Sequence, residues 1–312
     1  MNNNILRKIL GLLLSDLTGT TSAVAISLIE SCPDVSDEPD LMEYLNQSRK
    51  LKVEVNRQHF IKAMDSLELH RSLGIEVIPY GGEDYPLSLE LIDKPPTVIY
   101  YRGNLELLRE LPGVAVVGSR QITSNGSEIT RRITNTLVER DFVIVSGLAI
   151  GVDSAAHRAT IQAKGKTIAV LANGLDKALP KQNERLGTEI LEAGGAWVSE
   201  YPVGVRTMKH FFVQRNRIQV GLSAASVIVE AKLNSGTMTQ AEFCNRNNRP
   251  LFAVVPHLPN NPLGLECEGT SELVLAKRAY PLRSKRDYEN LVEIVTKSKR
   301  ELLEQCRISK LI

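Results

Sequence analysis

The sequence predicts an α/β protein, a Rossmann-like, doubly wound and mostly parallel sheet with a small N-terminal helical domain. From Gly113 onward, short apolar runs rich in β-branched residues alternate with amphipathic stretches of helical period. Strands that are apolar throughout are typically buried on both faces, and their alternation with helices indicates right-handed βαβ crossovers. Before Gly74, by contrast, apolar residues recur at steps of three and four, which predicts helices.

The expected elements follow in order along the chain. Residues 5–30 form two short helices joined at Thr18-Gly19-Thr20, residues 41–73 continue the helical period, and short strands are expected within 74–86 and at 97–101. Six strands then build the core, at 114–117, 142–145, 167–171, 196–199, 226–229 and 251–255. The helices between them are expected near 124–139, 153–164, 183–193, 211–222 and 237–247.

The predicted elements fall into four segments of the chain. They are an N-terminal helical domain (1–75), a short strand and linker lead-in (76–110), a Rossmann-like core (111–276) and a basic helical C-terminal extension (277–312). A basic run of this kind is typically a solvated helix face, and a contact with nucleic acid or a partner is the alternative. The basic residues of the extension are Lys285, Arg286, Lys297, Lys299 and Arg300.

The composition is that of an ordinary soluble globular protein. Of the 312 residues, 43% are hydrophobic and 24% charged, which excludes a collagen-like, mostly disordered or polytopic membrane protein. The net charge of +2 does not by itself indicate a nucleic-acid binder, so any basic surface must come from local placement of charge. The apolar run at 9–14 is too short for a signal peptide or a membrane span.

The cysteines predict no metal site. Four cysteines are scattered along the chain without a Cys-x-x-Cys pair, at Cys32, Cys244, Cys267 and Cys306. This cysteine usage is typical of a reduced, cytoplasmic protein. No metal is expected, and the sequence predicts no cofactor either.

The loops after the core strands could bind an anion. In an open parallel sheet, ligands bind beyond the carboxyl ends of the strands, where turns lead into helix N-termini. Small and basic residues gather in these loops. They are Gly118, Ser119 and Arg120 after the first core strand, Ser146 and Gly147 after the second, Lys181 and Asn183 after the third, Arg215, Asn216 and Arg217 near a helix start, and Ser235, Gly236 and Thr237 before the last helix.

These loops together predict a ligand that carries phosphate. Arg120 supplies a cation suited to a phosphate fork. Arg215 and Arg217 stand two residues apart and cannot share one helix face, so one is expected to face the crevice and the other to pack on a Glu or on backbone.

Six motifs in these loops, in order, resemble the DprA/Smf family (DNA processing protein A). They are GSR at 118–120, SGLAIGVDSAAH at 146–157, LANGLDKALPKQN at 171–183, SEYP at 199–202, RNRIQVGLS at 215–223 and VEAKLNSGTMTQA at 229–241. The similarity extends over residues 74–274, and the N-terminal helical segment is similar more weakly. In this sequence Ile150 stands where the family usually has Arg, Gln240 replaces the usual Thr, and Pro256-His257 replaces the usual Pro-Gly.

The resemblance implies a non-enzymatic protein that binds single-stranded DNA, dimerises and loads the recombinase RecA in natural transformation. It makes Arg120 the prime DNA contact, with Lys181, Arg215 and Arg217 as further contacts. The amides of Ser119, Gly147 and Gly236 would hold phosphates. The family's common C-terminal winged-helix domain is not expected in this sequence.

Two other functions remain open from the sequence. A nucleotide N-glycosidase of the lysine-decarboxylase-like type uses a PGGxGTxxE loop, in which Gln240 takes the place of the Glu. A nucleotide sensor would bind a small phosphorylated ligand without turnover, which the altered Ile150 position would suit. A nicotinamide-dependent oxidoreductase is least expected, because the G-x-G-x-x-G fingerprint is missing.

Overall fold

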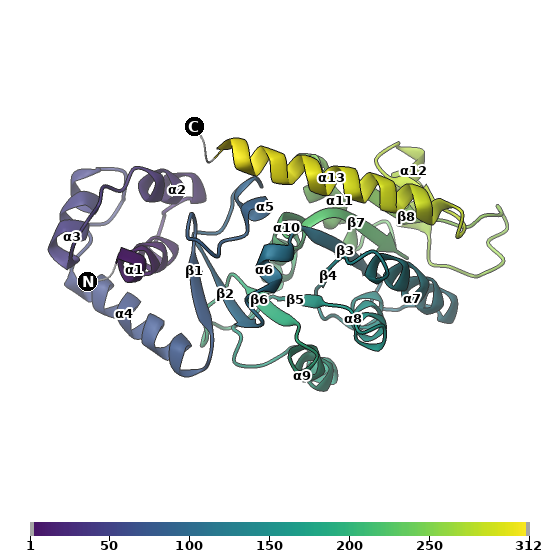
Figure 1. Ribbon diagram of the computed structural model, residues 1–312, viewed down its shortest axis with the longest axis horizontal. Helices are drawn as coiled ribbons and strands as arrows, with labels where there is room; N and C mark the ends of the chain where they lie inside the picture. The colour runs from purple at the N-terminus through teal and green to yellow at the C-terminus, as the bar shows by residue number, and fades with distance from the viewer. Residues whose placement is uncertain (1–2, 310–312) are drawn as a thin grey trace.

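The computed structural model describes residues 3–309, and it confirms the α/β class. Nine strands form one sheet: β1 (Glu76–Pro79), β2 (Val98–Gly103), β3 (Gly113–Gly118), β4 (Ile144–Ser146), β5 (Thr167–Leu171), β6 (Ala196–Ser199), β7 (Ser223–Val229), β8 (Leu251–Val254) and β9 (Tyr280–Leu282). Their spatial order is β1-β2-β6-β5-β4-β3-β7-β8-β9. Figure 1 labels the strands from β1 to β8. Strands β3 to β6 run outward in one direction, and β7 then pairs on the other side of β3, which is the doubly wound arrangement.

The two strands expected in the lead-in segment are present, and both join this sheet. Strands β1 and β2 pair antiparallel with each other, and β2 pairs antiparallel with β6, whereas the pairs from β6 through to β9 are parallel. Two short helices, α5 (Leu87–Glu90) and α6 (Leu107–Glu110), flank β2 along the chain.

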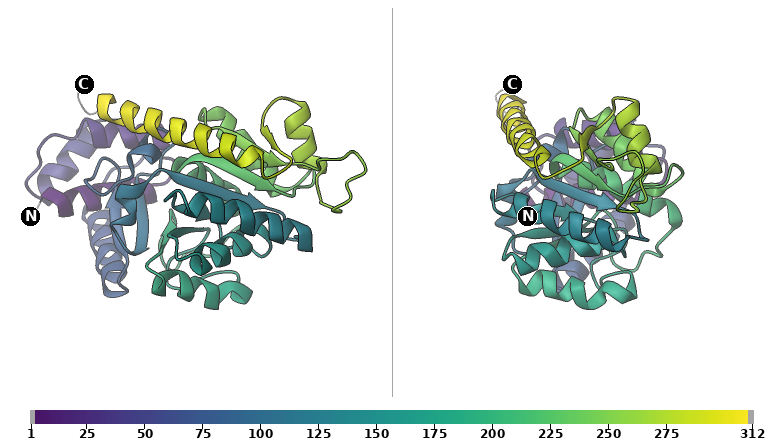
Figure 2. Two further views of the ribbon diagram at one scale, coloured as in Figure 1. Left: turned by 45° about the vertical axis from the view of Figure 1, so that its right-hand side comes forward. Right: turned by 90° about the vertical axis from the view of Figure 1, so that its right-hand side faces the viewer.

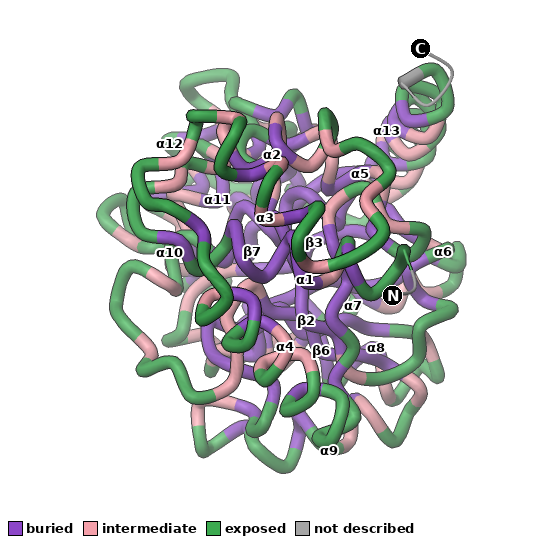
Figure 3. Tube along the Cα trace, turned by 90° about the vertical axis from the view of Figure 1, so that its left-hand side faces the viewer, coloured by how far each residue is buried: buried purple, intermediate pink, exposed green. Residues whose placement is uncertain are grey.

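The crossover helices lie within two residues of their predicted positions. They are α7 (Ser124–Val138), α8 (Val152–Gln162), α9 (Glu184–Glu192), α10 (Lys209–Gly221) and α11 (Gly236–Arg246), followed by α12 (Glu268–Leu275) and α13 (Asp287–Ser309). Apolar side chains of α7, α8 and α13 pack on one face of the sheet, and those of α5, α6 and α10 pack on the other. Burial is accordingly concentrated along the sheet, and the connecting loops are exposed (Figure 3).

Within the described residues 3–72, four helices are present: α1 (Asn3–Asp16), α2 (Ser22–Glu30), α3 (Glu38–Gln47) and α4 (Arg57–Ser72). The predicted continuous period over 41–73 is broken between α3 and α4, where Asn56 begins α4 with a capping box. Leucines of α1 share one apolar cluster with Val77 of β1 and Tyr100 of β2, so these helices cover the antiparallel end of the sheet.

The basic C-terminal segment is a docked helix. Helix α13 lies along the sheet (Figures 1 and 2). Its side chains Leu291, Val295 and Leu302 are buried. The hydroxyl of Ser298 donates to the carbonyl of Ala224 in β7 at 2.7 Å. The predicted segments 1–75 and 277–312 include residues 1–2 and 310–312, which lie outside the described residues. Over the part of the chain described here, no helix is long and apolar enough to cross a bilayer.

Candidate nucleic-acid interface

The structure brings eight of the predicted site residues to one cavity at the switch point of the sheet. Strands β3 and β7 are neighbours, but the chain leaves β3 toward α7 on one face and β7 toward α11 on the other, which opens a crevice between the two loops. A cavity of about 560 Å³ lies there. The predicted residues that line it are Gly118, Ser119, Arg120, Arg215, Asn216, Ser235, Gly236 and Thr237.

A cation and an aromatic ring lie together in this cavity. Arg120 is exposed, and its guanidinium carbon lies 5.6 Å from the ring centroid of Phe212 in the first turn of α10. Phe212 is 39% exposed, so one apolar ring lies open beside the charge. Phe212 lies just before the RNRIQVGLS motif, and the sequence offers no signal that this ring would meet Arg120.

The N-terminus of α11 supplies open amides to the same cavity. Among the described residues, no side chain caps this helix, because the hydroxyl of Ser235 donates instead to the carbonyl of Lys232 at 2.8 Å. Gly236 is exposed, and a Cβ atom built there would meet nothing within 4 Å. The partial positive charge of the helix end therefore faces solvent, which favours an anion.

Lys232 is a cavity residue that the sequence analysis did not single out. Its side chain is exposed and pairs with the carboxylate of Glu266 at 3.3 Å. Two hydrogen bonds tie the first turn of α11 to its neighbours. The hydroxyl of Thr237 donates to the carbonyl of Gly118 at 3.1 Å, and the side-chain amide of Asn216 donates to the hydroxyl of Thr239 at 2.9 Å.

The other two predicted amides are engaged within the protein. The amide of Gly147 donates to the carboxylate of Asp153 at 3.1 Å, and the amide of Ser119 donates to the carbonyl of Glu230 at 2.8 Å. Neither amide is therefore free to bind a phosphate in this conformation. Of the three amides predicted to hold phosphates, that of Gly236 remains.

Arg215 lines the cavity but is buried. Its side chain is 7% exposed, and its Nη1 donates to the carbonyl of Val170 at 2.8 Å. The guanidinium fills the space beside Gly147, where a Cβ atom would lie only 1.5 Å from Nη1. Burial lowers the pKa of Arg215 and raises that of Asp153, and each of these opposite charges counteracts the other's shift.

Arg217 lies outside the cavity. It is buried and forms an ion pair with Glu200. Of the two arginines, only Arg215 therefore faces the crevice, and Arg217 packs on a Glu, as their spacing predicts.

The remaining predicted residues do not line the cavity. Ser146 and Asn183 are buried, and they donate to the carbonyls of Val116 at 2.7 Å and Leu148 at 2.9 Å. Lys181 is exposed on the short 3-10 helix η1 (Lys181–Asn183), which follows β5 on the same edge of the sheet.

Two glutamines make part of the cavity polar and buried. Gln219 of α10 and Gln240 of α11 are each 1% exposed. Within the described residues, Nε2 of Gln219 and Oε1 of Gln240 have no hydrogen-bond partner, although Nε2 of Gln240 donates to Ser226 at 3.1 Å. Such a surface suits a ligand that forms hydrogen bonds more than an apolar one.

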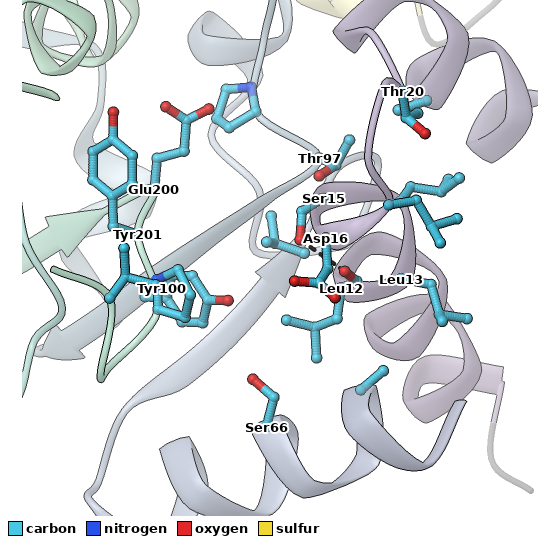
Figure 4. Close-up of a pocket in the computed structure, with 18 of the residues that line it drawn as sticks. Leu12, Leu13, Ser15, Asp16, Thr20, Ser66, Thr97, Tyr100, Glu200 and Tyr201 are labelled. Atoms are coloured by element: carbon cyan, nitrogen blue, oxygen red, sulfur yellow. Dashed lines mark hydrogen bonds between the residues drawn. The ribbon is translucent and has the colours of Figure 1, made fainter. Parts of the chain in front are cut away.

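A larger cavity, of about 830 Å³, lies between the N-terminal helices and the start of α10. Figure 4 shows Leu12 and Leu13 of α1 on one side of it and Tyr100 and Tyr201 on the other. Its lining includes none of the predicted site residues, but it includes three carboxylates, those of Asp16, Asp65 and Glu200. Negative charge at this cavity disfavours a phosphate. The smaller cavity, which holds eight of the predicted residues and the exposed Arg120, is therefore the candidate site.

Comparison with known proteins identifies the family. The family model for DNA recombination-mediator protein A matches residues 76–293. The chain belongs to this family. The match begins at β1 and ends within α13, so it includes every strand of the sheet and the whole candidate site.

Members of the family are similar in both sequence and structure. Protein Smf of Synechocystis sp. is 40% identical over 223 residues, which are 70% of this chain and 55% of that protein, so the chain matches little more than half of its length. The X-ray structure of DprA from Streptococcus pneumoniae matches with a TM-score of 0.70 and 31% identity, over 90% of this chain and 95% of that one. A structure of Helicobacter pylori DprA, described by its single-stranded DNA binding mode, matches with a TM-score of 0.62 and 28% identity, over 72% and 97% of the two chains.

Proposed function

We propose that this chain binds single-stranded DNA in the crevice between the loops after β3 and β7. The observation that carries the proposal is the guanidinium of Arg120 over the exposed ring of Phe212, in the same cavity as the uncapped N-terminus of α11. Exposed aromatic rings stack on unpaired bases, and a helix N-terminus with a nearby cation holds phosphate. In a duplex the bases are stacked inside, so this combination favours a single strand.

Electrostatic attraction in this site is local. The whole chain has a net charge of only +2, so the salt-dependent part of binding comes from Arg120, Lys232 and the dipole of α11. Each phosphate neutralised on a single strand contributes about 0.7 to the slope of log affinity against log salt concentration. Lys181, further along the same edge, is proposed as a peripheral contact.

The enzyme and sensor alternatives draw less support from the site. Position 240 holds an amide, buried and bonded to Ser226, which cannot accept a proton as the Glu of an N-glycosidase does. A nucleotide sensor would hold its phosphate with free amides, and two of the three amides predicted for this purpose, those of Ser119 and Gly147, are engaged within the protein.

We further propose that the chain acts as a cytoplasmic recombination mediator that protects incoming single strands and loads RecA in natural transformation, as a homodimer. Membership in the recombination-mediator family supports this role, and the H. pylori relative is described as binding single-stranded DNA.

The test is a titration of labelled single- and double-stranded oligonucleotides at two salt concentrations. Arg120→Ala is expected to weaken single-strand binding on the order of tenfold or more, because it removes a charge-assisted contact of about 1.5–3 kcal/mol. Arg140→Ala is the matched control, since Arg140 is exposed just past the opposite end of α7. Equal binding by wild type and Arg120→Ala, or a preference for duplex, would contradict the proposal.

A further inference from the structure

The loop that carries Arg120 is held at both ends by one residue, Glu230. On one side of Arg120, the amide of Ser119 donates to the carbonyl of Glu230 at 2.8 Å. On the other side, the amide and the hydroxyl of Thr123 donate to the two carboxylate oxygens of Glu230 at 2.9 and 2.7 Å. The main chain and the side chain of Glu230 thus clamp the two ends of a five-residue loop.

Glu230 adopts a conformation and a location that are unfavourable for a glutamate. It is 1% exposed, and its φ of +56° lies in the left-handed region that non-glycine residues rarely adopt. A buried carboxylate is costly unless it is fully hydrogen-bonded, and strained backbone persists where the surrounding structure enforces it, often at ligand sites. Here the amide of Glu266, in the loop before α12, donates to Oε1 at 3.1 Å as a third donor group.

The clamp joins the two halves of the candidate site. Glu230 directly follows β7 and begins the loop that leads through Lys232 to the N-terminus of α11. Its contacts with Ser119 and Thr123 therefore set the position of Arg120 relative to the open amides of α11. A binding site held rigid in this way loses less conformational entropy when the ligand binds.

We propose that Glu230 is a positioning residue for single-stranded DNA, acting through Arg120 without touching the DNA itself. This inference rests on the proposed function.

The direction in which Glu230→Gln changes DNA affinity distinguishes this positioning role from a purely electrostatic one. A buried carboxylate beside a phosphate site repels DNA, so removing its charge in Glu230→Gln would strengthen binding if charge alone mattered. In the clamp, however, the new side-chain NH₂ group would face N–H donors of Thr123 or Glu266, which leaves a donor without its acceptor and loosens the Arg120 loop. The clamp therefore predicts weaker binding despite the more favourable net charge.

The experiment measures single-strand affinity for wild type, Glu230→Gln, Arg120→Ala and the double variant. Glu230→Gln is expected to weaken binding about threefold to tenfold, equivalent to the loss of about one hydrogen bond. The double variant should match Arg120→Ala within about twofold, because a loop without Arg120 has nothing left to position. Glu242→Gln, which removes an exposed carboxylate from α11, is the control for the charge change.

Several results would overturn the inference. Unchanged or tighter binding by folded Glu230→Gln contradicts the clamp, and so do additive losses in the double variant, since a general structural defect adds to the Arg120 loss. Amide hydrogen exchange on the wild type is a readout that does not depend on folding of the variant. The amides of Ser119 and Thr123 should be protected without DNA, and rapid exchange at both would refute the clamp. Wild type that fails to bind any single strand would refute the proposed function instead.

Discussion

Replacement of Arg215 by Met is predicted to destabilise the protein, whereas replacement of Arg120 is predicted to spare stability. Arg215 is buried, bonded to the carbonyl of Val170 and opposite the buried carboxylate of Asp153. Met fills a similar space, so the energetic change comes mainly from the lost charge. Asp153 would then keep two amide donors, those of Gly147 and Ala149, but would lose its buried counter-charge.

Leaving a buried carboxylate without its nearby counter-charge is expected to cost up to about 3–5 kcal/mol, the range for breaking a buried ion pair. At about 2 °C per kcal/mol, this corresponds to a melting temperature lower by roughly 6–10 °C. Arg120→Ala changes an exposed side chain, and its unfolding free energy should stay within about 0.5 kcal/mol of wild type.

The assay is thermal and urea unfolding of the three proteins followed by circular dichroism, with single-strand affinity measured in parallel. In a double-variant cycle, Asp153→Asn combined with Arg215→Met should destabilise less than the sum of the single changes, because no unpaired charge is left buried. If Arg215→Met is as stable as wild type but no longer binds DNA, the structural role assigned to Arg215 is refuted. Arg215 would then be a direct DNA contact.

Two further predictions follow from single side chains. Phe212→Leu keeps an apolar group but removes the stacking ring. In a fluorescence titration, the free energy of single-strand binding should weaken by about 1–3 kcal/mol, while the slope of log affinity against log salt concentration stays unchanged. A changed slope would show that the ring contributes through the electrostatic part of binding. Burial lowers the pKa of His157 to about 3, so its contribution to stability is complete above the unfolded pKa of about 6.5 and is lost as the pH falls toward 3. Between pH 7 and 5, wild type should lose about 2 kcal/mol more unfolding free energy than His157→Gln, and parallel losses in urea titrations would contradict this.

Much of the fold follows from local sequence patterns. Apolar strands alternating with amphipathic helices determine the parallel core, and five crossover helices end within two residues of their expected limits. The same alternation places every βα loop on one edge of the sheet, so the region of the site could be predicted as well. The DprA/Smf motifs lie in and around these loops, and their order along the chain identified the family.

The roles of individual residues in these loops depended on tertiary contacts. Periodicity carries no information on which buried carboxylate will meet a given amide, and Asp153 and Glu230 engage groups that look free in the sequence. Thr123 and Glu230 lie 107 residues apart along the chain, and Phe212 reaches Arg120 from a different loop. The sequence by itself determined the scaffold and its binding edge, because both arise from local periodicity. Only the tertiary structure decided which cations face solvent, because that depends on side chains brought together from distant segments.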